Sequence, residues 1–330
     1  MQERTEQLLQ VGISRNDRML PLLNGDVSID GYELDFVEAE PSEIFWRALQ
    51  EGELDITEMS LAAYAILTAR GESQFVGLPV FTSRMFRHGA IFVSRQSSIT
   101  SAEQLEGRRI GVPEYQMTAA VWMRGILQSD YGVASDTVQW FTGGVNKPGR
   151  LERVELRTPP QYRIENIGRH GTLDAMLRAG EIDAIMSPQI PDSFNSGDGQ
   201  VKRLFVEHRA EEAAYFGRTS IFPIMHLLVI RKERYERDLD LALKLLNAFV
   251  EAELQSCKRL YDGNALYVML TWLISEIEAT MEVMGTDFWP YGIKKNRHVL
   301  YAFVPHLRDQ GLTEEQLDID ALFAREVLAT

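Results

Sequence analysis

The order of hydrophobic and polar positions along the chain predicts strands and helices in alternation. Residues 8–14 and 32–40 have the composition of short strands, and the second of them alternates polar with apolar side chains. Apolar residues in the segment 41–52 recur at the spacing of one helix face, which predicts a helix. Residues 52–71 predict a short strand, a turn and a second helix closed by glycine. The N-terminal part of the chain therefore has the pattern of an α/β protein.

The rest of the chain continues this alternation and ends in a helical part. The further predicted elements are a strand at 109–112, a helix from about residue 117, a strand at 136–144 that ends in a glycine turn, a strand at 222–233 and mainly helices after about residue 236. Residues 146–170 contain three prolines and are irregular, which predicts a long loop packed over a site. Strands that alternate with helices indicate parallel sheets, whose ligands bind beyond the carboxyl ends of the strands.

A short pattern occurs twice along the chain. The sequence GELDITEMS begins at Gly52 and GEIDAIMSP begins at Gly180, and each follows a predicted helix and covers a short strand. One such match carries little weight, because Gly-Glu-x-Asp is common where a helix turns into a strand. Two copies in the same context favour two related α/β lobes over chance. If the lobes face each other across a cleft, the turns after their strands converge on it.

Composition narrows the classes of protein and partner. The 330 residues are 45% hydrophobic and 25% charged, which is ordinary for a globular protein. The formal net charge of −14 argues against nucleic acid or an anionic membrane as a partner. The single cysteine, Cys257, excludes an intramolecular disulfide and a zinc cluster of cysteines. The chain shows no membrane-spanning apolar run and no signal-peptide pattern, so we expect a cytoplasmic protein unless a signal has been removed.

A cluster of cations stands out against this acidic background. Arg84, Arg87 and His88 lie close together in the segment PVFTSRMFRHGAIFVS, between two apolar runs. The planar guanidinium fork matches a carboxylate, so the cluster indicates a pocket for an anion. The alternative is an ordinary salt bridge on the surface or between lobes. Arg15 and Arg18, in the loop after the first predicted strand, are weaker candidates for the same role.

Several longer segments resemble one family. The segments DITEMSLAAYAI, PVFTSRMFRHGAIFVS, GRRIGVPEYQMTAAVWMRGIL with WFTGG, SIFPIMHLLVIR and DFWPYGIKKNR are similar to the 4,5-dihydroxyphthalate decarboxylase family, and the resemblance runs roughly from Val11 to Phe323. It implies an α/β, two-lobed type 2 periplasmic-binding-protein-like fold. Each lobe would be a mixed sheet flanked by helices, with the ligand cleft between the lobes. One lobe would comprise residues 1–95 plus 225–330, including the C-terminal helices, and the other residues 96–224.

The family also implies a reaction, the non-oxidative decarboxylation of 4,5-dihydroxyphthalate to 3,4-dihydroxybenzoate (protocatechuate) and CO2. This carboxy-lyase step of aromatic catabolism implies no organic cofactor. The substrate is a dianion, so Arg84, Arg87 or both would clamp its carboxylates. Direct loss of CO2 would leave an aryl carbanion that the ring does not stabilise. An easier route protonates the ring carbon that bears the carboxylate while the para hydroxyl loses its proton.

This route needs a proton donor at the ring carbon and a proton acceptor at the catechol end. His88 and His226 are the leading candidates because imidazole changes charge near neutral pH, although a lone histidine in an apolar strand is more often a core residue. Glu58 and Glu114, each between a predicted strand and a predicted helix, are further catalytic candidates. Their alternative role is to cap the start of a helix.

Further side chains are expected to bind the substrate. Three of them offer hydroxyl groups, namely Ser60, Thr118 and Ser187. Three could form aromatic walls, namely Tyr115, Trp140 and Phe222, and Gly143 lies in the glycine turn after residue 142. Their alternative roles are helix capping and core packing. Glu58, His88, Glu114 and His226 could hold a metal if they converged, but no metal-binding spacing supports this, and we expect none.

Two other functions stay open from the sequence. The fold would also suit a solute-binding protein for an aromatic or other carboxylate, and a related enzyme could decarboxylate another hydroxylated aromatic acid. In each case the partner is a small molecule rather than nucleic acid or a membrane. The apolar segment ALYVMLTWLISEIEATMEVM could be core or a subunit interface, so a homo-oligomer is mildly favoured and the oligomeric state stays open.

Overall fold

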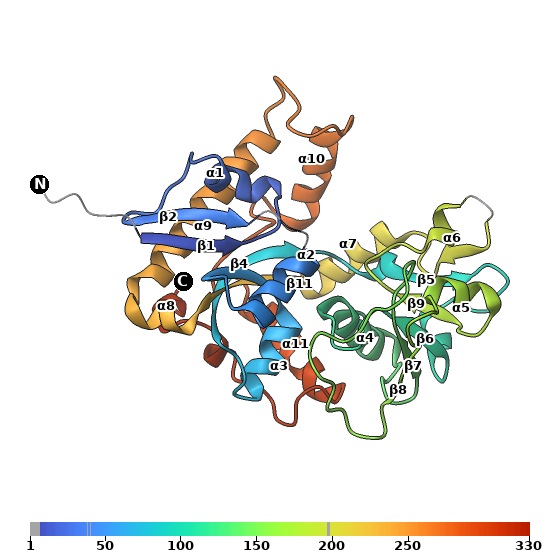
Figure 1. Ribbon diagram of the computed structural model, residues 1–330. Coiled ribbons are helices and arrows are strands. Elements are labelled where there is room, and N and C mark those ends of the chain that lie inside the picture. The colour runs from blue at the N-terminus through green and yellow to red at the C-terminus, as the bar shows by residue number, and fades with distance from the viewer. Residues whose placement is uncertain (1–6, 38, 40, 197–198) are drawn as a thin grey trace, which may run out of the picture.

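Two mixed β-sheets, each flanked by helices, form the two lobes of the chain (Figure 1). The computed structural model describes residues 7–37, 39, 41–196 and 199–330. The strands of the first sheet are β1 (Gln7–Gly12), β2 (Tyr32–Val37), β3 (Ile56–Ser60), β4 (Phe75–Arg84) and β11 (Ile224–Arg231), in the order β2-β1-β3-β11-β4. The first three pair in parallel, and β11 runs antiparallel to both β3 and β4.

The second sheet is built from the middle of the chain. Its strands are β5 (Ile91–Ser94), β6 (Arg109–Val112), β7 (Gln139–Thr142), β8 (Arg163–Asn166), β9 (Ala184–Met186) and β10 (Val201–Arg203), in the order β10-β5-β9-β6-β7-β8. The strands β6, β7, β8 and β9 pair in parallel, whereas β5 is antiparallel to β9 and β10. The two-lobed α/β fold expected from the sequence is therefore confirmed.

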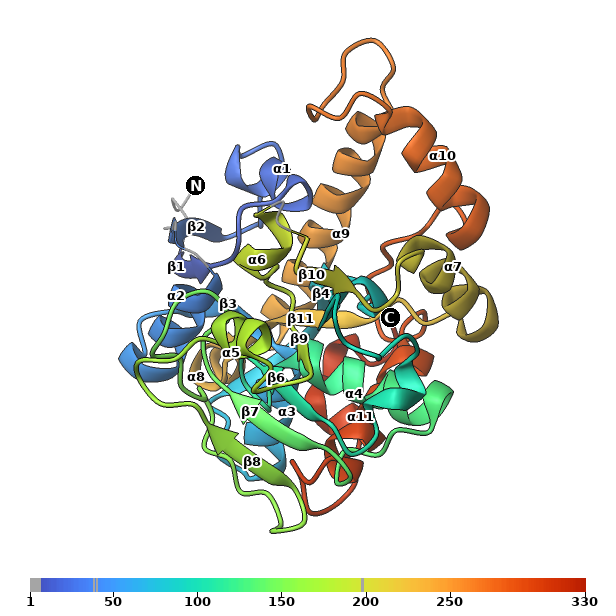
Figure 2. The same ribbon diagram turned by 90° about the vertical axis from the view of Figure 1, so that its right-hand side faces the viewer.

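The helices cover the sheets and extend the C-terminal part of the chain (Figure 2). They are α1 (Leu20–Leu23), α2 (Pro41–Trp46), α3 (Leu61–Ala69), α4 (Thr118–Tyr131), α5 (Leu173–Ala179), α6 (Asp192–Asn195), α7 (His208–Thr219), α8 (Lys232–Arg237), α9 (Asp240–Leu260), α10 (Leu273–Met284) and α11 (Arg297–Asp309). Two of them begin close to the boundary between the lobes. The helix α3 follows β3 directly, and α4 follows the loop after β6.

The repeated sequence pattern has the same place in both sheets. Gly52 and Gly180 each end a helical segment in the left-handed conformation, with φ of +68° and +73°, which glycine adopts without steric cost. The strands that follow, β3 and β9, each have one parallel and one antiparallel neighbour. The two copies therefore start equivalent strands of two related sheets.

The sheets divide the chain slightly earlier than the predicted boundary at residue 95. The strand β5, which we expected in the first lobe, pairs with β9 and β10 of the second sheet. The chain thus crosses between the lobes in the segment 85–90, here called the crossover, and returns just before β11. The reason is a register of backbone hydrogen bonds with distant strands, which local sequence does not encode.

Two other parts of the chain differ from expectation. The irregular segment 146–170 contains β8, a short edge strand whose exposed and polar residues give no hydrophobic pattern. The C-terminal helices do not belong to the first lobe alone: α9 packs on β4, whereas α11 packs against α4 of the second lobe. The remaining loop, residues 146–162, is here called the strap.

Candidate functional site

A cavity of about 300 Å³ lies between the two lobes. Its walls come from the ends of β3, β4 and β11, from the crossover, from the loop between β6 and α4, and from the strap. This volume is at the lower end of the range for small-ligand sites. Five of the sequence candidates line it, namely Ser60, Arg87, Glu114, Thr118 and His226.

Glu58 and His226 form a pair behind one wall of this cavity. Glu58 is 1% exposed, and its Oε1 and Oε2 accept hydrogen bonds from Ser14 Oγ (2.6 Å) and Ser14 N (3.1 Å). His226 Nδ1 lies 3.4 Å from Glu58 Oε1, at ion-pair distance. Burial opposes the ionisation of Glu58, but the contact with His226 and the two Ser14 bonds outweigh it and lower the pKa of the carboxyl. Glu58 is therefore an ionised carboxylate held against an imidazole.

The free edge of His226 faces the cavity. Its Nδ1 is buried on the Glu58 side, while the side chain as a whole is 22% exposed and lines the cavity. Phe45 packs against the imidazole edge-to-face, with ring centroids 4.9 Å apart. The opposite ring nitrogen, Nε2, is therefore the one available to a ligand. A carboxylate on one side and a ligand on the other is the arrangement that orients a histidine for proton transfer.

Arg87 is a buried cation in the lining of the cavity. It is 7% exposed, and its Nε and Nη1 donate to the thioether sulfurs of Met225 (3.4 Å) and Met85 (3.2 Å). Burial lowers the pKa of Arg87 to about 10, so the guanidinium stays charged at neutral pH. No carboxylate in the described part of the chain forms an ion pair with it. Thioether sulfur is a weak acceptor, so this charge is poorly compensated without an anion in the cavity.

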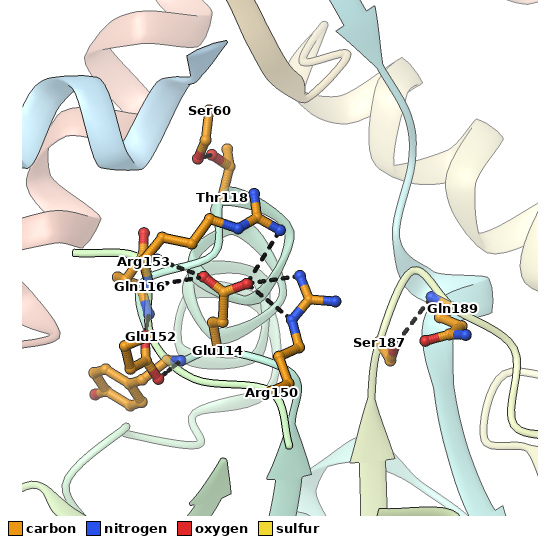
Figure 3. A network of polar contacts seen from close by, with 10 residues as sticks. Ser60, Glu114, Gln116, Thr118, Arg150, Glu152, Arg153, Ser187 and Gln189 are labelled. Carbon is orange, nitrogen blue, oxygen red and sulfur yellow. Dashed lines mark hydrogen bonds and ion pairs between the residues drawn. The ribbon is translucent and has the colours of Figure 1, made fainter. Parts of the chain in front are cut away.

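Glu114 is the centre of a charged cluster on the other side of the cavity (Figure 3). Its Oε1 accepts from Arg150 Nε (2.8 Å) and Nη2 (2.6 Å) and lies 3.2 Å from Arg153 Nη2. Its Oε2 accepts from Gln116 Nε2 (2.7 Å). Both oxygens are thus occupied, which favours a positioning role over the expected role in proton transfer.

The same cluster fixes the strap to the loop before α4. Glu152 of the strap accepts from the backbone N–H groups of Tyr115 (2.6 Å) and Gln116 (3.4 Å), and burial raises the pKa of Glu152 to about 7. Arg153 lies over the ring of Phe45, 5.3 Å from its centroid, and lines the cavity. The strap therefore brings a second cation, Arg153, to the same cavity as Arg87.

A pair of hydroxyl groups links the lobes at the starts of α3 and α4. Ser60 Oγ and Thr118 Oγ1 lie 2.8 Å apart, and Thr118 Oγ1 also accepts from Ala62 N (3.0 Å). Ser60 Oγ accepts from Ala63 N at 3.4 Å and caps α3. Both residues line the cavity, so their hydroxyls are available to a polar group of a ligand.

The structure does not bring Arg84 or His88 to this cavity. The guanidinium of Arg84 is bonded to the carbonyl oxygens of Phe222 (3.2 Å) and Pro290 (2.8 Å) and to the side chain of Asn296. His88 is 3% exposed and packs between the rings of Phe205 and Tyr215, and burial lowers its pKa to about 4. Both are buried in contacts with other parts of the chain, outside the lining of this cavity.

The other candidates also lie outside the lining of this cavity. Tyr115 and Trp140 pack against each other in the core, where Tyr115 stacks on the buried Arg124 at 3.8 Å. Arg18 stacks on Trp289, 3.9 Å from the ring centroid. Of the remaining candidates, Arg15 is exposed and Gly143 packs against Ile167. Ser187 Oγ accepts a hydrogen bond from the backbone N–H of Gln189. The ring of Phe222 contacts the rings of Phe86 and Trp289.

Sequence reasoning missed three residues at the site. Ser14 anchors Glu58, and Arg150 and Arg153 surround Glu114. The strap was expected to pack over a site, and its arginines were the available signal, but its partner loop could not be identified from the sequence. Among the described residues, no group of three or more His, Cys, Asp or Glu side chains is placed to hold a metal ion.

Comparisons with solved structures identify the fold class. The chain is similar to the periplasmic sulfonate-binding protein SsuA of Methylobacillus flagellatus KT, with a TM-score of 0.55 and 15% identity over 98% of this chain and 93% of that chain. The periplasmic aliphatic sulphonate binding protein SsuA of Escherichia coli gives a TM-score of 0.50 and 13% identity over 96% and 92%. A family model for the periplasmic substrate-binding protein of a phosphonate ABC transporter matches residues 22–148. The chain therefore has the two-lobed fold of periplasmic binding proteins.

Comparisons of sequence identify the family. A 4,5-dihydroxyphthalate decarboxylase of Comamonas testosteroni is 38% identical over 315 residues, which cover 96% of both chains. A 4,5-dihydroxyphthalate decarboxylase of Pseudomonas putida is 42% identical over 197 residues, which cover 60% of this chain and 76% of the relative. The chain belongs to the 4,5-dihydroxyphthalate decarboxylase family. No helix in the described part is both long and apolar enough to cross a membrane.

Proposed function

We propose that this chain is a carboxy-lyase that converts 4,5-dihydroxyphthalate to 3,4-dihydroxybenzoate and CO2 in the interlobe cavity. Family membership supports the reaction, and one structural observation carries the assignment of the site. A buried guanidinium without a carboxylate partner, Arg87, lines the same cavity as an imidazole backed by a buried carboxylate, the Glu58–His226 pair. The first suits an acidic substrate, and the second suits proton transfer to it.

The two arginines of the cavity bind the two carboxylates of the substrate. Arg87 forms no ion pair in the described part of the chain, while the charge of Arg153 is shared with Glu114. Since a strong cation on the leaving carboxylate would oppose its conversion to neutral CO2, Arg87 holds the carboxylate that is retained. Arg153, which is partly neutralised, lies at the carboxylate that leaves. The substrate has two equivalent carboxylates, so either orientation gives the same product.

His226 is the proton donor to the ring. Nε2 delivers a proton to the ring carbon that bears the leaving carboxylate, while the para hydroxyl gives its proton to solvent water and the ring becomes a cyclohexadienone. The bond to the carboxylate carbon then breaks, CO2 leaves, and the electron pair restores the aromatic ring and a phenolate oxygen, which takes up a proton. The Glu58 carboxylate orients the imidazole, and the hydroxyls of Ser60 and Thr118 offer hydrogen bonds to the catechol end.

The test is CO2 release by the purified, chelator-treated protein given 4,5-dihydroxyphthalate, with 3,4-dihydroxybenzoate followed by absorbance. We expect release at enzyme-like rates, and we expect His226→Ala to lower kcat at least ~10²-fold. The variant His88→Ala is the matched control and keeps kcat near the wild-type value. Tight binding without CO2 release would contradict the proposal and indicate a solute-binding protein. A cytoplasmic location and a homo-oligomeric state stay predictions from the sequence.

A further inference from the structure

A second cavity of about 310 Å³, here called the second compartment, adjoins the interlobe cavity. The two share Arg87 and Pro188 in their linings. The other walls of the second compartment come from the crossover, from β5 and β10, from the segment after β9 and from α7. Arg87 therefore forms part of the partition between two spaces, and its charge is available to an anion in either of them.

The second compartment has a cationic end. Arg203 donates to the carbonyl oxygen of Gly89 and lies over the ring of Phe92, 5.3 Å from its centroid. His208 packs closely on the crossover, and its Nδ1 has no hydrogen-bond partner in the described part of the chain. Glu212 is the single carboxylate of the described lining; its Oε1 accepts from Gly89 N (3.1 Å), and burial raises its pKa. The two arginines, Arg87 and Arg203, therefore outnumber this one acid.

The rest of the second compartment is apolar. Phe86, Phe92 and Ile190 line it together with Met85. Aromatic and aliphatic walls next to a few cations suit an aromatic ring that carries one carboxylate.

A third cavity, of about 220 Å³, offers a useful contrast. It shares Leu49 and Arg153 with the interlobe cavity, but its other cations are already occupied. Arg70 donates to the carbonyl oxygen of Glu155 (2.9 Å), and Arg157 pairs with Glu72 and with the carboxylate of Glu155 (both 2.9 Å). This cavity is therefore poorly suited to a carboxylate, although it also adjoins the site.

We propose that the second compartment is a subsite for aromatic monocarboxylates, through which the product leaves after the loss of CO2. This inference rests on the proposed function. The dianionic substrate is held by Arg87 and Arg153 together, whereas the product has a single carboxylate and loses its contact with Arg153. Because Arg87 lines both spaces, the remaining carboxylate keeps this partner while the ring moves from one cavity to the other. The second compartment then receives the ring between its apolar walls.

The experiment obstructs the second compartment in two ways. Ile190 is 37% exposed, so Ile190→Trp narrows the space and Ile190→Glu adds a repelling charge at a position that tolerates either side chain. The matched controls are Gln74→Trp and Gln74→Glu, at an exposed position in the lining of the third cavity. Bound 3,4-dihydroxybenzoate is displaced by excess phthalate in a stopped-flow instrument, and CO2 formation is measured separately in a single turnover.

We expect both Ile190 variants to lower the rate constant for product release about tenfold or more, which is roughly 1.4 kcal/mol of barrier, while single-turnover CO2 formation stays at the wild-type rate. The Gln74 variants should behave as the wild type in both measurements. Equal release rates in all five proteins would overturn the subsite, as would a matching loss of single-turnover rate in the Ile190 variants. Failure of the proposed function is a separate outcome, because then the wild type forms no CO2 at all.

Discussion

Two arginines close together in the chain differ in what compensates their charge. Arg84 and Arg87 are 5% and 7% exposed, and burial lowers the pKa of each, to about 9 and about 10. Arg84 donates through Nη1 and Nη2 to two carbonyl oxygens and an amide oxygen, which are strong acceptors. Arg87 meets two thioethers instead. A ligand therefore gains most from Arg87.

Replacement of each arginine by methionine, which keeps an unbranched apolar stem but removes the guanidinium, tests this difference. We expect Arg87→Met to weaken the binding of 4,5-dihydroxyphthalate about 10- to 100-fold, because hydrogen bonds to a charged group contribute roughly 1.5–3 kcal/mol. Arg84→Met should lower the melting temperature but leave the Kd of the folded protein near the wild-type value. Calorimetric titration and thermal unfolding of both variants provide the measurement. A Kd that changes only in Arg84→Met would refute the assignment.

The burial of His88 leads to a prediction about the stability of the fold rather than the rate of the reaction. Burial lowers its pKa to about 4, so between pH 6.5 and 4 the unfolded chain takes up a proton that the folded chain does not. This lowers the stability as the pH falls through that window, by roughly 3 kcal/mol at its lower end. His88→Leu should remove this part of the pH dependence. Urea unfolding at pH 7 and pH 4.5 checks it, and an unchanged difference between the two pH values would contradict it.

At the scale of elements, the strap shows what local pattern can and cannot predict. Its prolines and lack of periodicity predicted an irregular segment over a site, and it does reach the cavity through Arg153. The contacts that fix it, Arg150 and Arg153 on Glu114 and Glu152 on the loop before α4, join residues far apart in the chain. No local signal pairs these charges. The sequence could therefore indicate that Glu114 lies near the site, but not that its oxygens are occupied.

Glu114→Gln tests whether this carboxylate positions the strap. The amide keeps the shape of the side chain but removes the charge that holds Arg150 and Arg153, so we expect KM to rise about tenfold with a smaller change in kcat. The matched control is Glu72→Gln, which breaks the exposed pair with Arg157 on the same strap and should change neither constant appreciably. Steady-state kinetics of both variants provide the measurement. A loss of kcat at unchanged KM would instead return Glu114 to the proton-transfer step.

At the scale of the whole molecule, the sequence predicted the two lobes better than the point at which the chain crosses between them and the helices that pack on each. The repeated pattern at Gly52 and Gly180 identified equivalent strands, because a glycine C-cap followed by a buried strand is a local feature. The pairing of β5 with the second sheet and the packing of α11 on α4 depend on distant partners instead. The same limit applies to Arg84 and Arg87 and to His88 and His226. Residue type and position indicated the candidates, and only the fold shows which of them line the cavity.

The contact between α4 and α11 joins the C-terminal segment to the second lobe, and glycine makes it possible. A Cβ at Gly125 would lie 2.3 Å from Cδ2 of His306, whose ring also packs edge-to-face on Trp122 and cannot move aside freely. Replacement of a glycine in a helix by alanine normally stabilises the protein by roughly 1 kcal/mol. At Gly125 the clash should reverse the sign, so that Gly125→Ala lowers the free energy of unfolding by about 1–3 kcal/mol.

Gly217 in α7 is the matched control, because it also lies within a helix and an added Cβ there would meet no atom within 4 Å beyond the backbone of its own helix and its chain neighbours in the described part of the chain. Gly217→Ala should stabilise the chain by about 0.5–1 kcal/mol. Urea unfolding of both variants measures the two effects under the same conditions. If both substitutions stabilise the protein, α11 is not held against α4 at this point. The opposite signs expected here would show that α11 packs tightly on α4, so that the C-terminal segment, which packs on β4 through α9, is held by both lobes.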